Sequence, residues 1–278
     1  MHEAFNDISA LSLAADYRMA YGHLAADGLP TIDSKGQAPF AQAHGDLAID
    51  DDLIIAAPIW HDWGKILVFQ WNADGAEFEE LNFGGNGMTD DYGGKGDSRT
   101  PAHHIIGLAE AMKRGLSSAF VITQASAHAA PTLGNEYKVV NWIRAAAIIA
   151  RIDPVATGYL WRDSAGRLRL PALAATGSFD LRTAENPSPP FLPEFIIHQL
   201  SDANFYLSVP AGFDLGLILA KLAPEFGFDP KDQASFNSSF RNPVLSYLSA
   251  ERLIFIFARQ GIDGVRTEVR KLRSAGLI

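Results

Sequence analysis

The sequence contains no cysteine, so disulfide bonds and thiolate metal ligands are excluded. Basic residues are also few: 23 Lys and Arg stand against 32 Asp and Glu, and the formal net charge is −9. This acidic balance disfavours binding to nucleic acid or to an anionic membrane surface. We find no unbroken apolar run long enough to cross a bilayer. The composition therefore predicts a soluble protein without nucleic-acid or membrane partners.

The N-terminal segment has neither the basic nor the apolar region of a secretory signal. The lack of cysteine does not decide the compartment, because an exported and processed chain could have the same composition. We therefore expect a cytoplasmic protein and keep an exported mature chain as the alternative.

The sequence does contain a histidine next to an aspartate, His61 and Asp62, directly after the apolar run 53–60. Burial of that run would carry both polar side chains toward the core. A buried imidazole and carboxylate must be paired, hydrogen-bonded or bound to a cation. Both are ordinary ligands of divalent metals. The alternative is a surface histidine beside an aspartate at a helix end.

Residues 139–153 show the apolar period of a helix with one buried face. The stripe runs through Val139, Ile143, Ala146 and Ala150, and its next member is Asp153. An acid in that position is expected to point inward, as a metal ligand. The alternative is a frayed helix end that leaves Asp153 in water.

Further histidines could complete such a site, and several fall in the first half of the chain: His44, His61, His103, His104 and His128. Adjacent helical residues point in different directions, so we expect only one of His103 and His104 to bind metal. The other then contacts the substrate or orients a ligand. On a helix, Lys65 lies on the same face as His61 and Asp62, so its ammonium should project toward the metal.

The ordered set His61-Asp62-Trp63-Gly64-Lys65, His103-His104-Ile105-Ile106-Gly107, His128 and Asp153 resembles the HD-domain superfamily of metal-dependent phosphohydrolases. Its spacing is similar to that of the two-metal branch, which includes the HD-GYP-type enzymes. The resemblance covers residues 40–155. It implies a helical bundle and hydrolysis of a phosphoester by metal-activated water.

The resemblance also implies roles for individual residues. The implied metal ligands are His44, His61, Asp62, His104, His128 and Asp153. The implied catalytic residues are Asp62, as a metal bridge, and Lys65, facing the substrate phosphate. Substrate binding would involve Lys65, Arg99 and His103, although Arg99 could equally be a solvated loop arginine. The cofactor would be one or two divalent ions, of Mn, Fe, Ni, Zn, Co or Mg.

The sequence departs from this branch at two points. His128 stands alone and no Gly-Tyr-Pro motif follows it, so hydrolysis of cyclic dinucleotides does not carry over. The first histidine of the family pattern is also open. We prefer His44, with His23 as the alternative.

We predict a mainly α-helical protein with three parts. Residues 1–155 form the HD-like helical core. Residues 156–185 hold a β-hairpin and a connector, because alternating residues flank a glycine turn at 158–170. Residues 186–278 form a helical C-terminal extension.

The predicted function is hydrolysis of a small phosphorylated molecule, such as a nucleotide, by a phosphomonoesterase or phosphodiesterase. Two alternatives remain: an HD-fold di-iron oxygenase and a non-catalytic, metal-stabilised binding module. The C-terminal region could cover the core, complete a pocket or form a homodimer.

Overall fold

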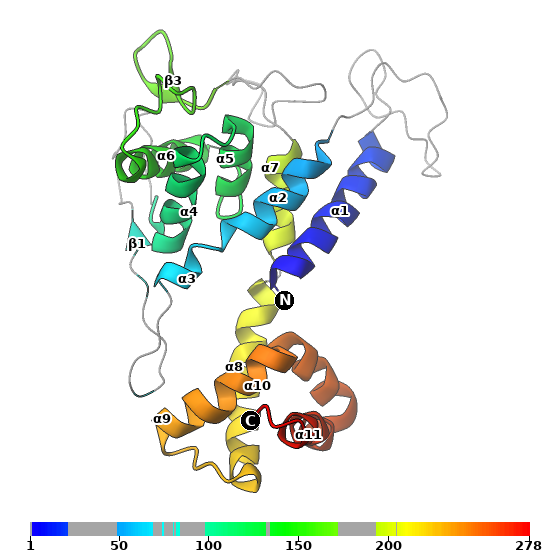
Figure 1. The fold of residues 1–278 in the computed structure, drawn as a ribbon. Coiled ribbons are helices and arrows are strands. Elements are labelled where there is room, and N and C mark those ends of the chain that lie inside the picture. Colours follow the sequence, from blue (N-terminus) through cyan, green and yellow to red (C-terminus); the bar gives the residue numbers. More distant parts are fainter. Residues whose placement is uncertain are drawn as a thin grey trace. The chain divides into compact units, whose positions relative to one another are not determined.

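The computed structural model describes residues 2–21, 49–68, 74, 80, 82–83, 98–131, 134–171, 193–203 and 205–278 (Figure 1). It is mainly α-helical, as predicted. The α-helices are α1 (His2–Tyr21), α2 (Asp51–His61), α3 (Lys65–Val68), α4 (Ala102–Lys113), α5 (Ser118–Ala125), α6 (Glu136–Ala150), α7 (Pro193–Asp202), α8 (Phe205–Leu222), α9 (Gln233–Phe236), α10 (Asn242–Leu248) and α11 (Ala250–Ser274). A 3-10 turn, η1 (Ala223–Phe226), follows α8, and a π-helical turn, η2 (Asn237–Arg241), joins α9 to α10.

The strands form two short antiparallel pairs. β1 (Asn82–Phe83) pairs with β2 (Thr100–Pro101). β3 (Trp161–Arg162) pairs with β4 (Leu168–Arg169), which confirms the predicted hairpin.

Contacts divide the chain into two units, which we describe separately. The larger unit comprises residues 3–66 and 80–203. The smaller comprises 204–278 together with 1–2 and 67–79. This division differs from the boundary that we predicted at residue 186. Helix α7 belongs to the larger unit because it packs against α2 and α5.

Helix α2 forms where the sequence indicated. Asp50 is its N-cap, and the Asp50 carboxylate accepts hydrogen bonds from the backbone N–H groups of Asp52 and Leu53 at 2.9 and 3.2 Å. The helix ends at His61, four residues short of Lys65, so Asp62 and Lys65 do not belong to it. A turn at 62–64 then leads into α3.

The larger unit is built on α4, which packs against α6, and on α2 and α5, which pack against each other (Figure 1). Its main core includes Leu108, Ile122 and Ile143, all essentially unexposed. A smaller apolar cluster joins α1, α2 and α7 through Ala10, Ile54 and Ile197. These two clusters hold the ends of α2, α4 and α7 in place.

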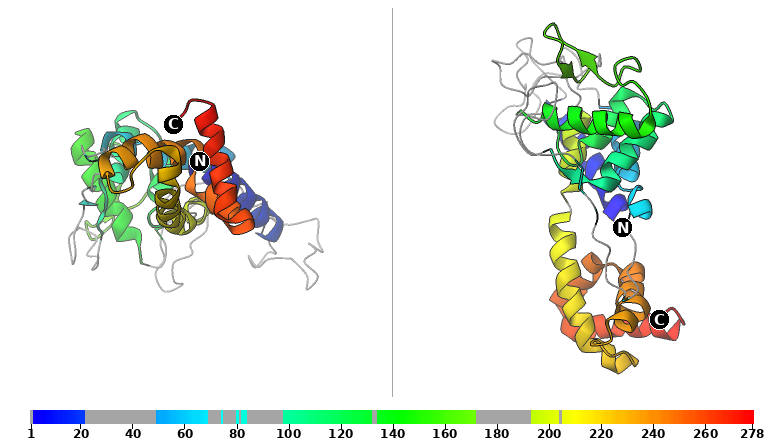
Figure 2. Two further views of the ribbon diagram at one scale, coloured as in Figure 1. Left: turned by 90° about the horizontal axis from the view of Figure 1, so that it is seen from below. Right: turned by 90° about the vertical axis from the view of Figure 1, so that its left-hand side faces the viewer.

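The smaller unit has its own apolar core. Helix α8 packs along α11, and α10 packs beside both the π-helical turn and α11 (Figure 2). The core includes Leu215, Leu219, Phe240, Val265 and Val269, all fully buried. Among the described residues, every buried member of this core lies between residues 215 and 272.

One helical stretch, Pro193–Phe226, is long and apolar enough to span a membrane by length and composition. Its most apolar window has a mean hydropathy of 1.4 and is 29% buried. Core helices of soluble proteins meet the same criterion. Our search for an unbroken apolar run did not find this stretch, because polar residues such as His198 and Asp202 interrupt it.

Candidate metal centre

The candidate site lies where α2 ends, and His61 is its central residue. The imidazole is 1% exposed, and its Nδ1 lies 2.7 Å from the carbonyl oxygen of Pro58. A carbonyl oxygen only accepts hydrogen bonds, so Nδ1 carries the proton and donates. The other ring nitrogen, Nε2, faces two carboxylates, at 3.1 Å from Asp202 Oδ1 and 3.5 Å from Asp62 Oδ1. A helix-end carbonyl therefore orients the ring so that Nε2 meets two acids.

His103, in the first turn of α4, repeats this arrangement from the opposite side. Its Nδ1 lies 2.9 Å from Glu80 Oε2, and its Nε2 lies 3.2 Å from Asp62 Oδ1. The backbone N–H of His103 also donates to Glu80, at 2.5 Å. Glu80 thus holds both the first turn of α4 and the imidazole ring of His103 in place. Metal-binding histidines are commonly held in this way by a carboxylate or carbonyl at the second ring nitrogen.

Asp62 connects these groups through different oxygens. Oδ1 faces the rings of His61 and His103, whereas Oδ2 pairs with the ammonium of Lys65. The Asp62 side chain is 7% exposed, so few solvent molecules compete with these partners.

Asp202, at the end of α7, supplies the second acid. Its Oδ1 accepts a hydrogen bond from Asn6 Nδ2 in α1 at 3.2 Å, in addition to facing His61. Glu3, also in α1, places Oε2 3.4 Å from His61 Nδ1. Carboxylates from α1, α2 and α7 therefore surround one imidazole.

The electrostatics reflect this concentration of acids. Burial alone would lower the pKa of His61, but the hydrogen bond with Asp202 and the charges of Asp62, Asp202 and Glu3 raise it to about 9. Burial would raise the pKa of Asp62, but the hydrogen bond from His103 and the charges of His61 and Lys65 hold it far below its usual range. The site therefore stabilises positive charge, as a cation-binding site must.

Three more histidines lie next to this group and are neutral. Burial, with the charges of neighbouring histidines, lowers the pKa of His128 to about 4 and of His198 to about 3, and also lowers that of His104. The ring of His104 lies 4.1 Å from that of His128, and the ring of His198 lies 5.2 Å from that of His61, between centroids. Neutral imidazole is the protonation state that binds metals.

Two of these rings contain nitrogens that are buried without a hydrogen-bond partner. They are both nitrogens of His104 and Nε2 of His198, counted over the residues that the structure describes. His198 Nδ1, in contrast, donates to Thr123 O at 2.7 Å, which leaves the lone pair on Nε2. Leaving a polar atom buried and unpaired costs free energy, so these nitrogens are suited to a bound ion or water.

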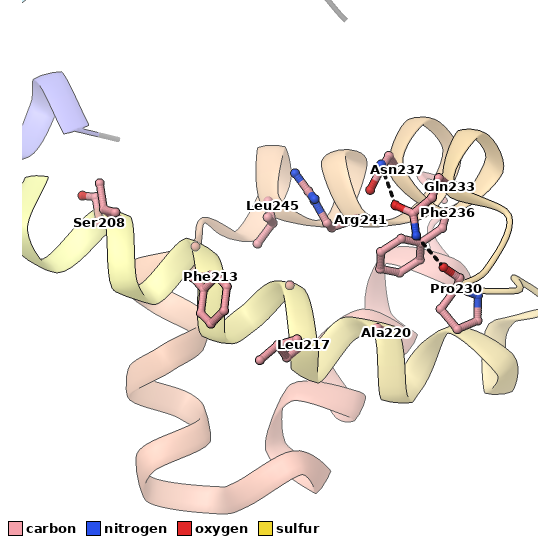
Figure 3. Close-up of a pocket in the computed structure, with 13 residues that line it drawn as sticks. Ser208, Phe213, Leu217, Ala220, Pro230, Gln233, Phe236, Asn237, Arg241 and Leu245 are labelled. Atoms are coloured by element: carbon pink, nitrogen blue, oxygen red, sulfur yellow. Dashed lines mark hydrogen bonds between the residues drawn. The ribbon is translucent and has the colours of Figure 1, made fainter. Parts of the chain in front are cut away.

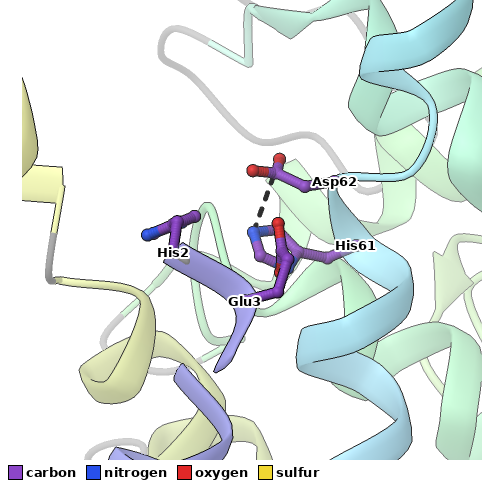
Figure 4. A group of neighbouring side chains, drawn as sticks. All are labelled: His2, Glu3, His61 and Asp62. Carbon is purple, nitrogen blue, oxygen red and sulfur yellow. Dashed lines mark ion pairs between the residues drawn. The ribbon is translucent and has the colours of Figure 1, made fainter. Parts of the chain in front are cut away.

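Four side chains meet the distance requirements for one metal ion: His2, Glu3, His61 and Asp62 (Figure 4). One ligand atom from each lies within 4.8 Å of the others. His2 and Glu3 come from the first turn of α1, and His61 and Asp62 from the end of α2. The chain therefore contains a group that could hold a metal ion.

The prediction for Asp153 is wrong in this structure. Asp153 is exposed, and its carboxylate accepts from the backbone N–H groups of Val155 and Ala156 at 2.8 and 3.2 Å. The helical stripe through Val139, Ile143 and Ala146 is buried as predicted. However, α6 ends at Ala150, and the left-handed backbone of its C-cap Arg151 (φ 57°) redirects the chain before Asp153.

The other predicted residues fall into three groups. His61, Asp62, Lys65, His103, His104 and His128 are brought together, but His103 rather than His104 contacts Asp62. Arg99 is exposed, between the buried Ser98 and Thr100. His44 and His23, the two candidates for the first ligand, lie outside the described residues.

The sequence analysis missed His2, Glu3, Glu80, His198 and Asp202. A signal did exist for the residues of α7. Glu194, His198 and Asp202 recur every fourth residue of α7, and all three are buried.

No family model, curated protein or solved structure matches the chain.

Proposed function

We propose that this protein is a metal-dependent phosphohydrolase of the HD type, acting on a small phosphorylated molecule. One observation carries the proposal. The Nε2 atoms of His61 and His103 both face Asp62 Oδ1, while each Nδ1 is held by a separate acceptor, Pro58 O or Glu80. Two oriented imidazoles directed at one carboxylate favour a cation between them.

The residues present fit a divalent ion. His61, Asp62 and Asp202 would hold it, with Glu3 and His2 beside them. His103, His104, His128 and His198 provide further neutral or orientable nitrogens for a second ion. A divalent ion would supply a low pKa for a coordinated water and neutralise phosphate oxygens.

The chain's own residues would position the substrate. Lys65 follows the turn after α2 and is 35% exposed at its side chain, so its ammonium is accessible from solvent while it pairs with Asp62. A phosphate at the site would compete for that ammonium. A cation placed against a phosphoryl group lowers the energy of the transition state, in which charge is redistributed.

The position of Asp202 supports the HD interpretation with one change, in which Asp202 replaces Asp153 as the last carboxylate ligand. The resemblance requires a closing carboxylate after the last histidine, and Asp153 does not provide it. Asp202 follows His128 in the chain and faces His61 at 3.1 Å. We therefore propose the ordered set His61-Asp62, His103, His128 and Asp202.

Elemental analysis of the purified protein, followed by a panel of phosphomonoesters and phosphodiesters, tests the proposal. We expect bound Mn, Fe, Ni, Zn, Co or Mg and metal-dependent hydrolysis of at least one compound. Asp202→Asn should lose metal and activity together, since it removes a charge that faces His61. Asp153→Asn is the matched control and should retain both.

Two outcomes would contradict the proposal. Oxygen consumption with bound iron, but no phosphoester hydrolysis, would favour the di-iron oxygenase. Stoichiometric metal in a protein that is inactive with every phosphoester would favour a metal-stabilised binding module.

A further inference from the structure

The smaller unit contains a groove that the proposed function does not use (Figure 3). It has a volume of about 800 Å³ and lies between α8 on one side and α9, the π-helical turn and α10 on the other. This volume is in the range of small-molecule sites. The lining is mostly apolar and includes Val209, Phe213, Leu217, Phe236 and Leu245.

Small residues on α8 keep this groove open. Gly212, Gly216 and Ala220 are spaced four residues apart, so they lie on one face of the helix, and all three line the groove. A Cβ atom added at Gly212 or Gly216 would meet no atom within 4 Å. Packing therefore does not require either glycine. Each glycine costs about 1 kcal/mol relative to alanine inside a helix, and packing among the described residues does not offset that cost.

Two polar side chains of the groove come from the π-helical turn. Asn237 begins this turn and Arg241 ends it, and both line the groove. π-helical turns occur frequently at functional sites. Asn237 is 3% exposed, and its Oδ1 is buried without a hydrogen-bond partner among the described residues. Its Nδ2 donates to Gln233 Oε1 at 3.4 Å, which leaves Oδ1 as the unsatisfied atom.

Arg241 supplies the positive charge of the groove, where it lies between Leu245 and Asn237 (Figure 3). Its Nε donates to Asn242 Oδ1 at 3.2 Å. None of the other lining residues is charged. A ligand that fills the groove would therefore meet mostly apolar walls and one cation.

From these features we infer that the groove binds a small amphipathic anion. The ligand has an aromatic or acyl body, which packs between Phe213, Leu217 and Leu245, and one anionic group, which pairs with Arg241. This inference uses only residues of the smaller unit and does not depend on the metal centre.

Fluorescence titration of the full-length protein with 8-anilinonaphthalene-1-sulfonate tests the inference, because that probe combines aromatic rings, an N–H group and one anion. Decanoate should displace the probe, whereas decanol and decylamine, which lack the negative charge, should displace it at least tenfold less well. A tenfold difference corresponds to about 1.4 kcal/mol, the scale of one charge-assisted hydrogen bond.

Three variants locate the binding site. Gly216→Leu should abolish binding, because its side chain fills the groove without a backbone clash. Arg241→Gln should weaken decanoate about tenfold and leave decanol unchanged. Lys221→Gln is the control for loss of a positive charge, since Lys221 is an exposed cation of α8 that does not line the groove. Helical circular dichroism and the thermal midpoint check that each variant folds.

Certain results would overturn the inference. Equal competition by decanoate and decanol would identify a non-specific apolar surface. Equal binding by folded Gly216→Leu and the parent protein would place the probe elsewhere. A dimer that Gly216→Leu converts to monomer, with no displacement by decanoate, would assign the groove to a second copy of the chain.

Discussion

At the scale of single residues, Asp62 links three partners in the candidate site: His61, His103 and Lys65. One oxygen faces two imidazoles and the other pairs with Lys65, in surroundings that exclude most water. The low pKa of Asp62 means that its carboxylate stays ionised throughout the physiological range. Its neighbours therefore compete for a permanent negative charge.

Lys65 provides the first prediction. Lys65→Gln should retain bound metal but lower phosphoester turnover by about a hundredfold, because under the proposed function it removes the ammonium that would face the substrate phosphate. Turnover and metal content, measured on the same preparation, check this. Near-parental turnover would show that Lys65 serves only to pair with Asp62.

The same scale shows which site residues the sequence could predict. His61 and Asp62 stood out because they directly follow an apolar run, and His103, His104 and His128 because they fit the ordered pattern of the resemblance. Glu80 did not, because its contact with His103 joins segments that are not adjacent in sequence. His198 and Asp202 follow a proline-rich stretch, and we assigned that whole region to a separate extension. Only the packing of α7 against α2 brings them to the site.

At the scale of elements, helix existence was easier to predict than helix ends. The apolar stripe of α6 and the Asp50 cap of α2 both arise from local physics, and both are present. The left-handed Arg151 that ends α6 is an arginine in a conformation more typical of glycine. No sequence pattern marked this position, so the direction of Asp153 was mispredicted.

The turn after α2 gives the second prediction. A Cβ atom at Gly64 would lie 2.6 Å from the carbonyl oxygen of His103, which is backbone and cannot rotate away. Gly64→Ala should therefore lower the free energy of unfolding by about 1–3 kcal/mol, the usual cost of overpacking. It should also reduce metal retention, since the turn and His103 would have to separate. Chemical denaturation and elemental analysis measure the two effects.

Gly107 is the matched comparison for Gly64. Its added Cβ would meet Gln124 Nε2 at 2.9 Å, and a side-chain amide can move. Alanine also favours the interior of α4 over glycine by about 1 kcal/mol. Gly107→Ala should thus cost clearly less than Gly64→Ala. Equal losses in the two variants would mean that the contact with His103 does not limit packing.

At the scale of the whole molecule, the two apolar clusters of the larger unit share no described residue with the core of the smaller unit. The residues of the candidate metal centre come from the ends of α1, α2, α4 and α7. These helices pack into the apolar clusters of the larger unit, to which all of the residues except His2 belong. The groove draws on α8 to α10 of the smaller unit. A perturbation in one core should therefore affect one site and leave the chemistry of the other intact.

Matched core substitutions test this separation in the full-length protein. Leu219 and Ile143 are both fully buried, the first in the core of the smaller unit and the second in that of the larger. Each change to alanine should cost about 2–5 kcal/mol locally. In hydrogen-exchange mass spectrometry, Leu219→Ala should raise exchange within 205–278 and leave bound metal unchanged. Ile143→Ala should raise exchange in α4 and α6 and lower metal retention. If Leu219→Ala raised exchange in α4 and α6 equally, the two cores would unfold as one cooperative unit, and sites on them could not be altered independently.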